Sequence, residues 1–147
     1  MPKPNEFTSL NELFANLNKT ITGIIQDENG SVVKAGIDAL KTSVQENVYD
    51  VYDPYLYERT GELKEEWKVE KEDGGIAIMS NRYDGNTYVA QVVETGVGYR
   101  YSFLFDGTPR PFTQLAAEEL QGTGKLTLAL SNELKRRGFR LVLKAVN

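Results

Sequence analysis

A chain of 147 residues that is 40% hydrophobic and 26% charged suits one folded domain with its own core, so we expect a single domain over residues 1–147. The sequence contains no Cys and no His, which excludes disulfides, thiolate nucleophiles, cysteine zinc sites and acid–base chemistry by histidine. A formal net charge of −4 argues against a protein whose whole surface binds nucleic acid. No apolar run approaches the roughly 20 residues that cross a bilayer, and the first residues lack the apolar core of a secretion signal, so a soluble intracellular product is expected.

The charges are shared unevenly along the chain. Residues 1–74 carry 15 acidic and 8 basic side chains, whereas residues 75–147 carry 6 acidic and 9 basic ones. Chance together with solvated helix faces is the favoured explanation of this distribution. A sharper interpretation is that copies of the chain meet acidic face to basic face, in a head-to-tail contact that closes into a ring.

The N-terminal part is predicted to form a flexible arm and two helices. Residues 1–8 contain two prolines and form the arm. Ser9 and Glu12 then make a capping-box pair at the start of a helix over residues 10–26, whose apolar positions recur at helical spacing (Leu10, Leu13, Phe14, Leu17, Ile21 and Ile24). Gly30 suits a left-handed turn, and Ser31 can cap a second helix that ends near Tyr52. Two amphipathic helices in succession predict a helical hairpin packed on a core, which we favour over a partner-binding helix.

The segment from Asp53 to Leu63 is interpreted as an ordered junction between a helical half and a β-rich half. Pro54 stops the preceding helix, and Gly61 permits a turn that a side chain would penalise. A plain loop with a helix stop and a turn glycine is the alternative.

A β-hairpin is predicted after this junction. Residues 62–66 suit one turn of helix, residues 67–70 alternate between apolar and charged, and Asp73-Gly-Gly75 suits a tight turn before residues 76–79. Residues 81–86 read as a polar turn. Residues 87–93 fit a third strand or a short helix, and their β-branched content favours the strand.

The C-terminal half predicts an aromatic strand, two helices and a last strand. Tyr99, Tyr101, Phe103 and Phe105 share one side of a strand, which packs on the helices in preference to meeting another subunit. Pro111 and Phe112 open a helix that Gly122-Thr-Gly124 breaks, and Thr123 caps a helix that ends in Lys135-Arg-Arg137 and Gly138. Residues 139–146 alternate like a strand. The expected fold is therefore α+β, with an N-terminal helical hairpin packed on a small, mainly antiparallel β-sheet and further C-terminal helices.

Two groups of residues are candidates for a site of chemistry. Carboxylates at Asp50, Asp53, Glu58 and Glu62 could hold Mg²⁺ for a nuclease-like reaction, but their spacing matches no known metal loop, and acidic surface explains them better. Lys125 follows Gly122-Thr-Gly124, yet the upstream glycine spacing of a phosphate-binding loop is missing and Leu126 stands where that loop needs Ser or Thr. We therefore expect no catalytic residues, no metal, no cofactor and no enzymatic activity.

Three segments together resemble a family of tailed-phage proteins at the head-to-tail junction, known as neck, tail-completion or minor tail components. They are Arg59-Thr-Gly-Glu-Leu63, Val93-Glu-Thr-Gly96, and Arg110-Pro-Phe112 followed by an acidic, alanine-rich helix and a helix that ends in Lys and Arg. The resemblance covers about residues 30–138. The chain departs from the family pattern in the aromatic segment between Gly96 and Arg110 and in the strand after Gly138.

The resemblance implies a structural protein that forms a ring, with a hexamer favoured, and joins the tail to the filled capsid. Its partners would be tail tube or terminator proteins and head connector proteins, and DNA would pass through the ring without sequence recognition. Such a protein belongs to the virion and is assembled in the host cytoplasm, away from membranes. A tail terminator that caps the tail tube is the first alternative, and a metal-dependent nuclease using the Asp/Glu group is the second.

The residues that match the motifs are expected to have structural roles in the main. They are Arg59, Thr60, Gly61, Leu63, Glu94, Gly96, Arg110, Pro111 and Phe112. Gly61 and Gly96 suit turns, Pro111 suits helix entry and Phe112 suits the core. Arg59 or Arg110 is the expected partner of Glu94.

Overall fold

A computed structural model describes residues 7–51, 61–97 and 109–139. Several predicted features lie outside these ranges, namely most of the arm, most of the junction from Asp53 to Leu63, the aromatic row from Tyr99 to Phe105, and the last strand beyond Phe139.

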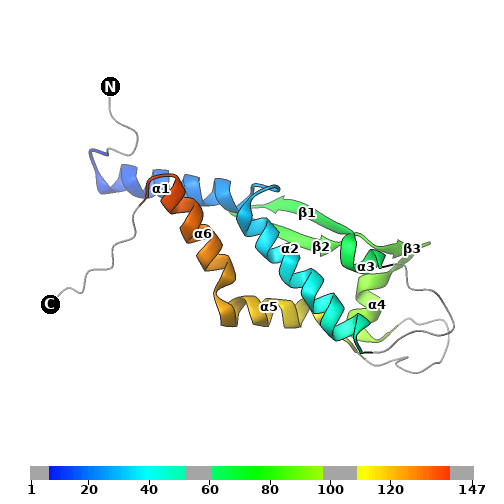
Figure 1. The fold of residues 1–147 in the computed structure, drawn as a ribbon. Coiled ribbons are helices and arrows are strands. Elements are labelled where there is room, and N and C mark those ends of the chain that lie inside the picture. The colour runs from blue at the N-terminus through cyan, green and yellow to red at the C-terminus, as the bar shows by residue number, and fades with distance from the viewer. Residues whose placement is uncertain (1–6, 52–60, 98–108, 140–147) are drawn as a thin grey trace.

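The described residues form an α+β fold in which one helix occupies the centre. Helix α1 (Leu10–Ile25) is followed by α2 (Ser31–Val44), which continues as a π-helical turn, η1 (Gln45–Tyr49). In Figure 1, α2 lies across a β-hairpin on one side and beside the C-terminal helices α5 and α6 on the other. The expected α+β layout of a helical pair, a small antiparallel sheet and further C-terminal helices is confirmed.

Small residues let neighbouring elements approach α2 closely. Gly36, Ala39 and Ser43 are buried and recur at spacings of three and four, so they lie on one face of the helix. A Cβ atom added at Gly36 would lie 2.8 Å from Cδ1 of Ile78 on the hairpin. The absence of a side chain at Gly36 thus sets the distance between α2 and the sheet.

The hairpin consists of β1 (Trp67–Glu72) and β2 (Gly75–Ser80), paired antiparallel from Trp67 opposite Ser80 to Glu72 opposite Gly75. Its two-residue turn has Gly74 at φ 71°, a left-handed conformation that glycine adopts without strain. The side-chain amide of Gln26, just after α1, donates to the carbonyl oxygens of Glu72 (2.8 Å) and Gly75 (3.0 Å). The end of the first helix therefore holds the hairpin turn in place.

The segment after the hairpin differs from the prediction. Residues 83–88 form a small second hairpin of β3 (Tyr83–Asp84) and β4 (Thr87–Tyr88), and Val89–Thr95 then forms helix α4. The strand favoured for residues 87–93 is thus wrong beyond Tyr88. A helix brings Ala90 and Val93, three residues apart, onto one buried face, and this packing outweighs the β propensity of the valines.

The remaining helices are α3 (Glu62–Glu65), α5 (Phe112–Thr123) and α6 (Lys125–Arg136). The predicted break between α5 and α6 occurs at Gly124, which has φ 67° and serves as the cap between the two helices. Thr123 does not cap α6 as expected, because its hydroxyl donates to the carbonyl of Glu119 within α5 (2.8 Å).

Two helix starts also differ in detail from the sequence pattern. Ser9 caps α1 by accepting from the backbone N–H of Glu12 (3.2 Å), but the Glu12 carboxylate accepts from the backbone and hydroxyl of Thr8. These hydrogen bonds, the hydroxyl bond first, lower the pKa of Glu12. Gly30 has φ −82° and is itself the cap of α2, so the left-handed turn at Gly30 and the cap at Ser31 are both wrong.

The buried side chains form two clusters along the molecule. One cluster joins α2 and η1 to α3, α4 and α5 around Val44, Val48, Leu63, Val93 and Phe112. The other joins α1, α2 and α6 around Ile24, Val32 and Leu134.

Candidate functional site

The three sequence motifs meet in the first of these clusters. Leu63 of α3, Val93 of α4 and Phe112 of α5 are all buried, and Phe112 is only 1% exposed. Leu63 and Val93 are 30 residues apart in the sequence, and Val93 and Phe112 are 19 residues apart. The motifs therefore share a place in the fold, which we call the motif junction (Leu63, Val93, Glu94, Arg110 and Phe112).

Backbone and side-chain hydrogen bonds tie the motif junction together. The backbone N–H of buried Arg110 donates to the carbonyl of Val93 (3.0 Å), which joins the second motif to the third. The hydroxyl of Ser43, on α2, donates to the carbonyl of Phe112 (2.6 Å) and accepts from the side-chain amide of Asn47 (3.0 Å). Because Ser43 is buried, this bond satisfies polar groups that water does not reach.

Glu94 caps helix α5 from the neighbouring helix α4. Its two carboxylate oxygens accept from the backbone N–H groups of Thr113 (3.0 Å) and Gln114 (3.2 Å). The first N–H groups of a helix have no partner within the helix, and the side chain of Pro111, the cap residue of α5, makes no capping hydrogen bond. A negative charge at this end also interacts favourably with the helix dipole. The motif carboxylate thus has a structural task.

The other motif residues lie at turns and at a helix start. Gly61 (φ 79°) precedes α3 and buried Gly96 (φ 72°) ends α4, both in left-handed conformations that favour glycine. Pro111 immediately precedes the first residue of α5. Arg59 and Thr60 lie outside the described residues, so the suggested pairing of Arg59 with Glu94 stays a prediction.

Two of the four carboxylates weighed for Mg²⁺ binding are described, and both have partners within the protein. Asp50 accepts from the side-chain amide of Gln45 (2.7 Å), and Glu62 pairs with Arg82 (2.6 Å). Over residues 7–51, 61–97 and 109–139, no three acidic side chains gather in a way that could hold a metal ion.

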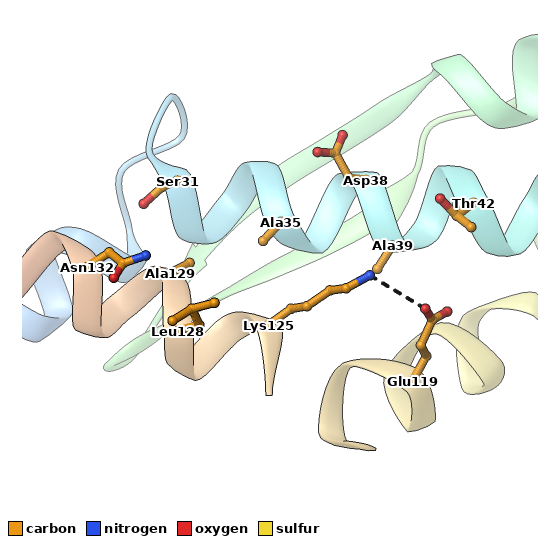
Figure 2. Close-up of a pocket in the computed structure, with 10 residues that line it drawn as sticks. All are labelled: Ser31, Ala35, Asp38, Ala39, Thr42, Glu119, Lys125, Leu128, Ala129 and Asn132. Atoms are coloured by element: carbon orange, nitrogen blue, oxygen red, sulfur yellow. Dashed lines mark ion pairs between the residues drawn. The ribbon is translucent and has the colours of Figure 1, made fainter. Parts of the chain in front are cut away.

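A groove of about 410 Å³, lined by charged, polar and apolar side chains, runs between α2 and the α5–α6 pair. Figure 2 shows the Lys125 side chain extending beneath Ala35 and Ala39 toward Glu119, whereas Asp38 points away from this pair. The Lys125 to Glu119 distance is 3.7 Å, and both side chains are well exposed. An exposed pair of this kind contributes about 0–1 kcal/mol. Lys125, the residue considered for phosphate binding, therefore faces a carboxylate.

A second groove, of about 500 Å³, is apolar. It lies between the hairpin and the α5–α6 pair, with α2 as its floor, and Val33, Leu40, Ile78 and Leu120 are among its lining residues. None of the described residues that line this groove is ionisable.

The sequence pattern predicted neither the buried hydrogen bond of Ser43 nor the role of Glu94 as a helix cap. The spacing of Gly36, Ala39 and Ser43 on one helix face was an available signal that Ser43 is buried. Nothing local marks Glu94 as a cap, because its partners follow 19 and 20 residues later.

Comparisons with known proteins place the chain among phage-derived sequences. The family model described as YomN matches residues 9–136, from the cap of α1 to the last residue of α6. A Bacillus subtilis (strain 168) protein described as "SPbeta prophage-derived uncharacterized protein YomN" is 35% identical over 119 residues, which cover 79% of this chain and 85% of that protein. No solved structure matches. None of the helices in the described residues is long and apolar enough to cross a membrane. These matches support a phage origin, and neither name states a role.

Proposed function

This chain belongs to the YomN family, and on that premise we propose that it is a non-enzymatic structural protein of the head-to-tail junction of a tailed phage. Copies of the chain form a ring, with six as the expected number. The ring joins the tail tube or its terminator to the head connector and lets DNA pass through without reading its sequence.

The main support for the proposal is that the described motif residues have structural roles in the fold. Glu94 caps a helix, Phe112 and Leu63 fill a core, and Gly61 and Gly96 form turns, so these residues maintain a shape. A conformation held this firmly around α3, α4 and α5 suits a protein that presents surfaces to other proteins. The prophage origin of a relative that matches 79% of this chain agrees with a place in a phage particle.

Deletion of the gene from the phage tests the junction role. We expect filled heads and tails of normal length that do not attach to one another, visible by electron microscopy. Supplying the protein from a plasmid restores joined particles, and antibody labelling places it at the neck. In a parallel experiment the plasmid supplies the Glu94→Ala variant in place of the wild type. Comparison of the two plasmids shows whether joining requires the intact fold or only the presence of the gene product.

Other outcomes count against the proposal in distinct ways. Overlong tails in the deletion strain would indicate a tail terminator that caps the tube. Particles of normal number and form would remove the protein from the assembly pathway. DNA cleavage by the purified chain with Mg²⁺, lost in Asp53→Ala, would replace the structural role with the nuclease alternative.

A further inference from the structure

Exposed apolar side chains gather at two opposite ends of the molecule. The exposed large apolar residues of the described chain are Leu10, Phe14, Val51, Tyr83, Val97 and Leu128. Leu10 and Phe14 belong to the first half of α1, at one end in Figure 1. Tyr83 lies in β3, and Val51 and Val97 lie two residues after the ends of η1 and α4, toward the other end. Leu128 of α6, which lines the groove beside Lys125, lies at neither end.

The end formed by α1 and the last turn of α6 is basic. Leu17 and Ile21 of α1 pack against the cluster that contains Leu134, so the end of α6 lies beside α1. Residues 9–19 and 133–139 carry four basic and two acidic side chains, a formal charge of +2. Glu133 pairs with Arg136 (2.7 Å) and Arg137 (3.7 Å), which leaves a net positive group next to the apolar stripe. We call these residues the basic end.

The opposite end is acidic. It is built from residues 45–51, 61–66, 81–97 and 109–110, which carry seven acidic and three basic side chains. Lys41 of α2 also belongs here because it pairs with Glu65 (3.1 Å), and the formal charge is then −3. The motif junction holds these segments together, since Val48, Leu63, Val93 and Phe112 share one core cluster. Glu46 and Asp84 are exposed there, close in sequence to exposed Val51 and Tyr83. We call these residues the acidic end.

We propose that the basic end of one copy docks on the acidic end of a second copy, with Leu10 and Phe14 packing against the apolar residues Val51, Tyr83 and Val97. This inference rests on the proposed function, because it names the contact that would build the ring. Each end combines apolar area with a charge of the sign opposite to that of the other end, the combination found where protein surfaces meet specifically. Two basic ends repel, and so do two acidic ends, which disfavours a two-fold dimer that joins like ends. A contact between unlike ends repeats from copy to copy and closes into a ring when the rotation permits.

Cross-linking between single cysteines tests the contact cleanly because the natural chain contains no Cys. Phe14→Cys and Val97→Cys replace side chains that are 54% and 73% exposed, one at each end. One variant carries a small affinity tag, so that mixed and like dimers differ in size after treatment with a short bis-maleimide. Leu128→Cys is the matched control, since that side chain is 60% exposed and lies at neither end.

We expect a cross-linked mixed dimer from Phe14→Cys and Val97→Cys together, and little product from either variant alone. A chain carrying both cysteines gives a ladder of oligomers. Self-linking of Phe14→Cys as strong as the mixed reaction shows an isologous contact and overturns the proposal. The proposal is also overturned if Phe14→Cys and Val97→Cys cross-link no better than Phe14→Cys and Leu128→Cys. It is overturned as well if the protein is a monomer in which its own chain shields the Phe14→Cys thiol from the reagent.

Charge reversal gives a second, independent measurement. Lys135→Glu with Arg136→Glu should raise the apparent dissociation constant of self-association about tenfold, and added salt should weaken the wild-type contact. Mixing this variant with Glu46→Lys/Asp50→Lys restores opposite charges and should recover association, whereas equal weakening in the mixture refutes the contact. The outcome is separable from that of the proposed function. If the cross-links form but the protein is absent from phage particles, the head-to-tail role is refuted and the contact stands. If the protein is found at the neck but the cross-links do not form, this contact is refuted and the role stands.

Discussion

Replacing Glu94 by alanine removes the cap of a helix that is 19 residues away in the sequence. The carboxylate accepts two backbone N–H groups at the start of α5, at 3.0 and 3.2 Å. After the change these donors turn to water, and α5 loses a negative charge at its positive end. Loss of a capping acceptor costs about 1 kcal/mol, and loss of the charge about 0.5 kcal/mol.

The expected loss of stability for Glu94→Ala is therefore about 1.5 kcal/mol, or a tenfold change in the unfolding equilibrium. For a domain of this size that corresponds to a fall in Tm of about 3–6 °C. Urea denaturation followed by circular dichroism gives the free energy of unfolding directly. Glu94→Gln keeps an acceptor oxygen without the charge, so we expect an intermediate value.

The matched control is Glu118→Ala on α5 itself. Glu118 accepts a side-chain hydrogen bond from Gln114 (3.0 Å), one turn away on the same helix. Such a pair contributes about 0.2–0.5 kcal/mol. Equal losses of stability for Glu94→Ala and Glu118→Ala would refute the capping role, because removal of any carboxylate near α5 would then have the same effect.

Three further predictions concern glycines, the core and the N-terminus. Gly23→Ala should stabilise the fold by up to about 1 kcal/mol in denaturation measurements, because no atom lies within 4 Å of the added Cβ on α1. Gly36→Ala should yield no such gain, because Cδ1 of Ile78 would lie 2.8 Å from the added Cβ. Adding Ile78→Val to Gly36→Ala should recover part of the gain. Equal gains for Gly23→Ala and Gly36→Ala would contradict this packing of α2 on the hairpin. Phe112→Ala should cost about 3–5 kcal/mol, since that ring is 1% exposed, and a Tm within error of wild type would show that the motif junction is not a core. Thr8→Ala should raise the pKa of Glu12 toward its ordinary value in NMR titrations, since the hydroxyl bond from Thr8 is the main cause of the lowered pKa. Because the pKa of Glu12 is lowered in the folded protein, this bond stabilises the start of α1 at pH values above the ordinary pKa of glutamate. The stabilisation is lost as the pH falls through the pKa of Glu12 in the folded protein. An unchanged Glu12 pKa in Thr8→Ala would contradict this account.

Several features that depend on neighbouring residues were predicted correctly from the sequence, although the caps at Ser31 and Thr123 were not. The first helix, the hairpin turn at Asp73-Gly74 and the helix break at Gly124 each follow from side-chain spacing or from a glycine that must adopt positive φ. These signals are local, because hydrogen bonds in a helix and in a two-residue turn join residues a few positions apart.

The tertiary structure alone decided the rest. Residues 89–95 form a helix despite their valines because Ala90 and Val93 have a core to face, which is a property of other segments. Glu94 caps α5, and Ser43 binds the carbonyl of Phe112 from 69 residues away. A single sequence shows that a carboxylate or a hydroxyl is present. Its hydrogen-bond partner depends on which helices and strands pack together, and that packing results from the burial of apolar surface over the whole chain.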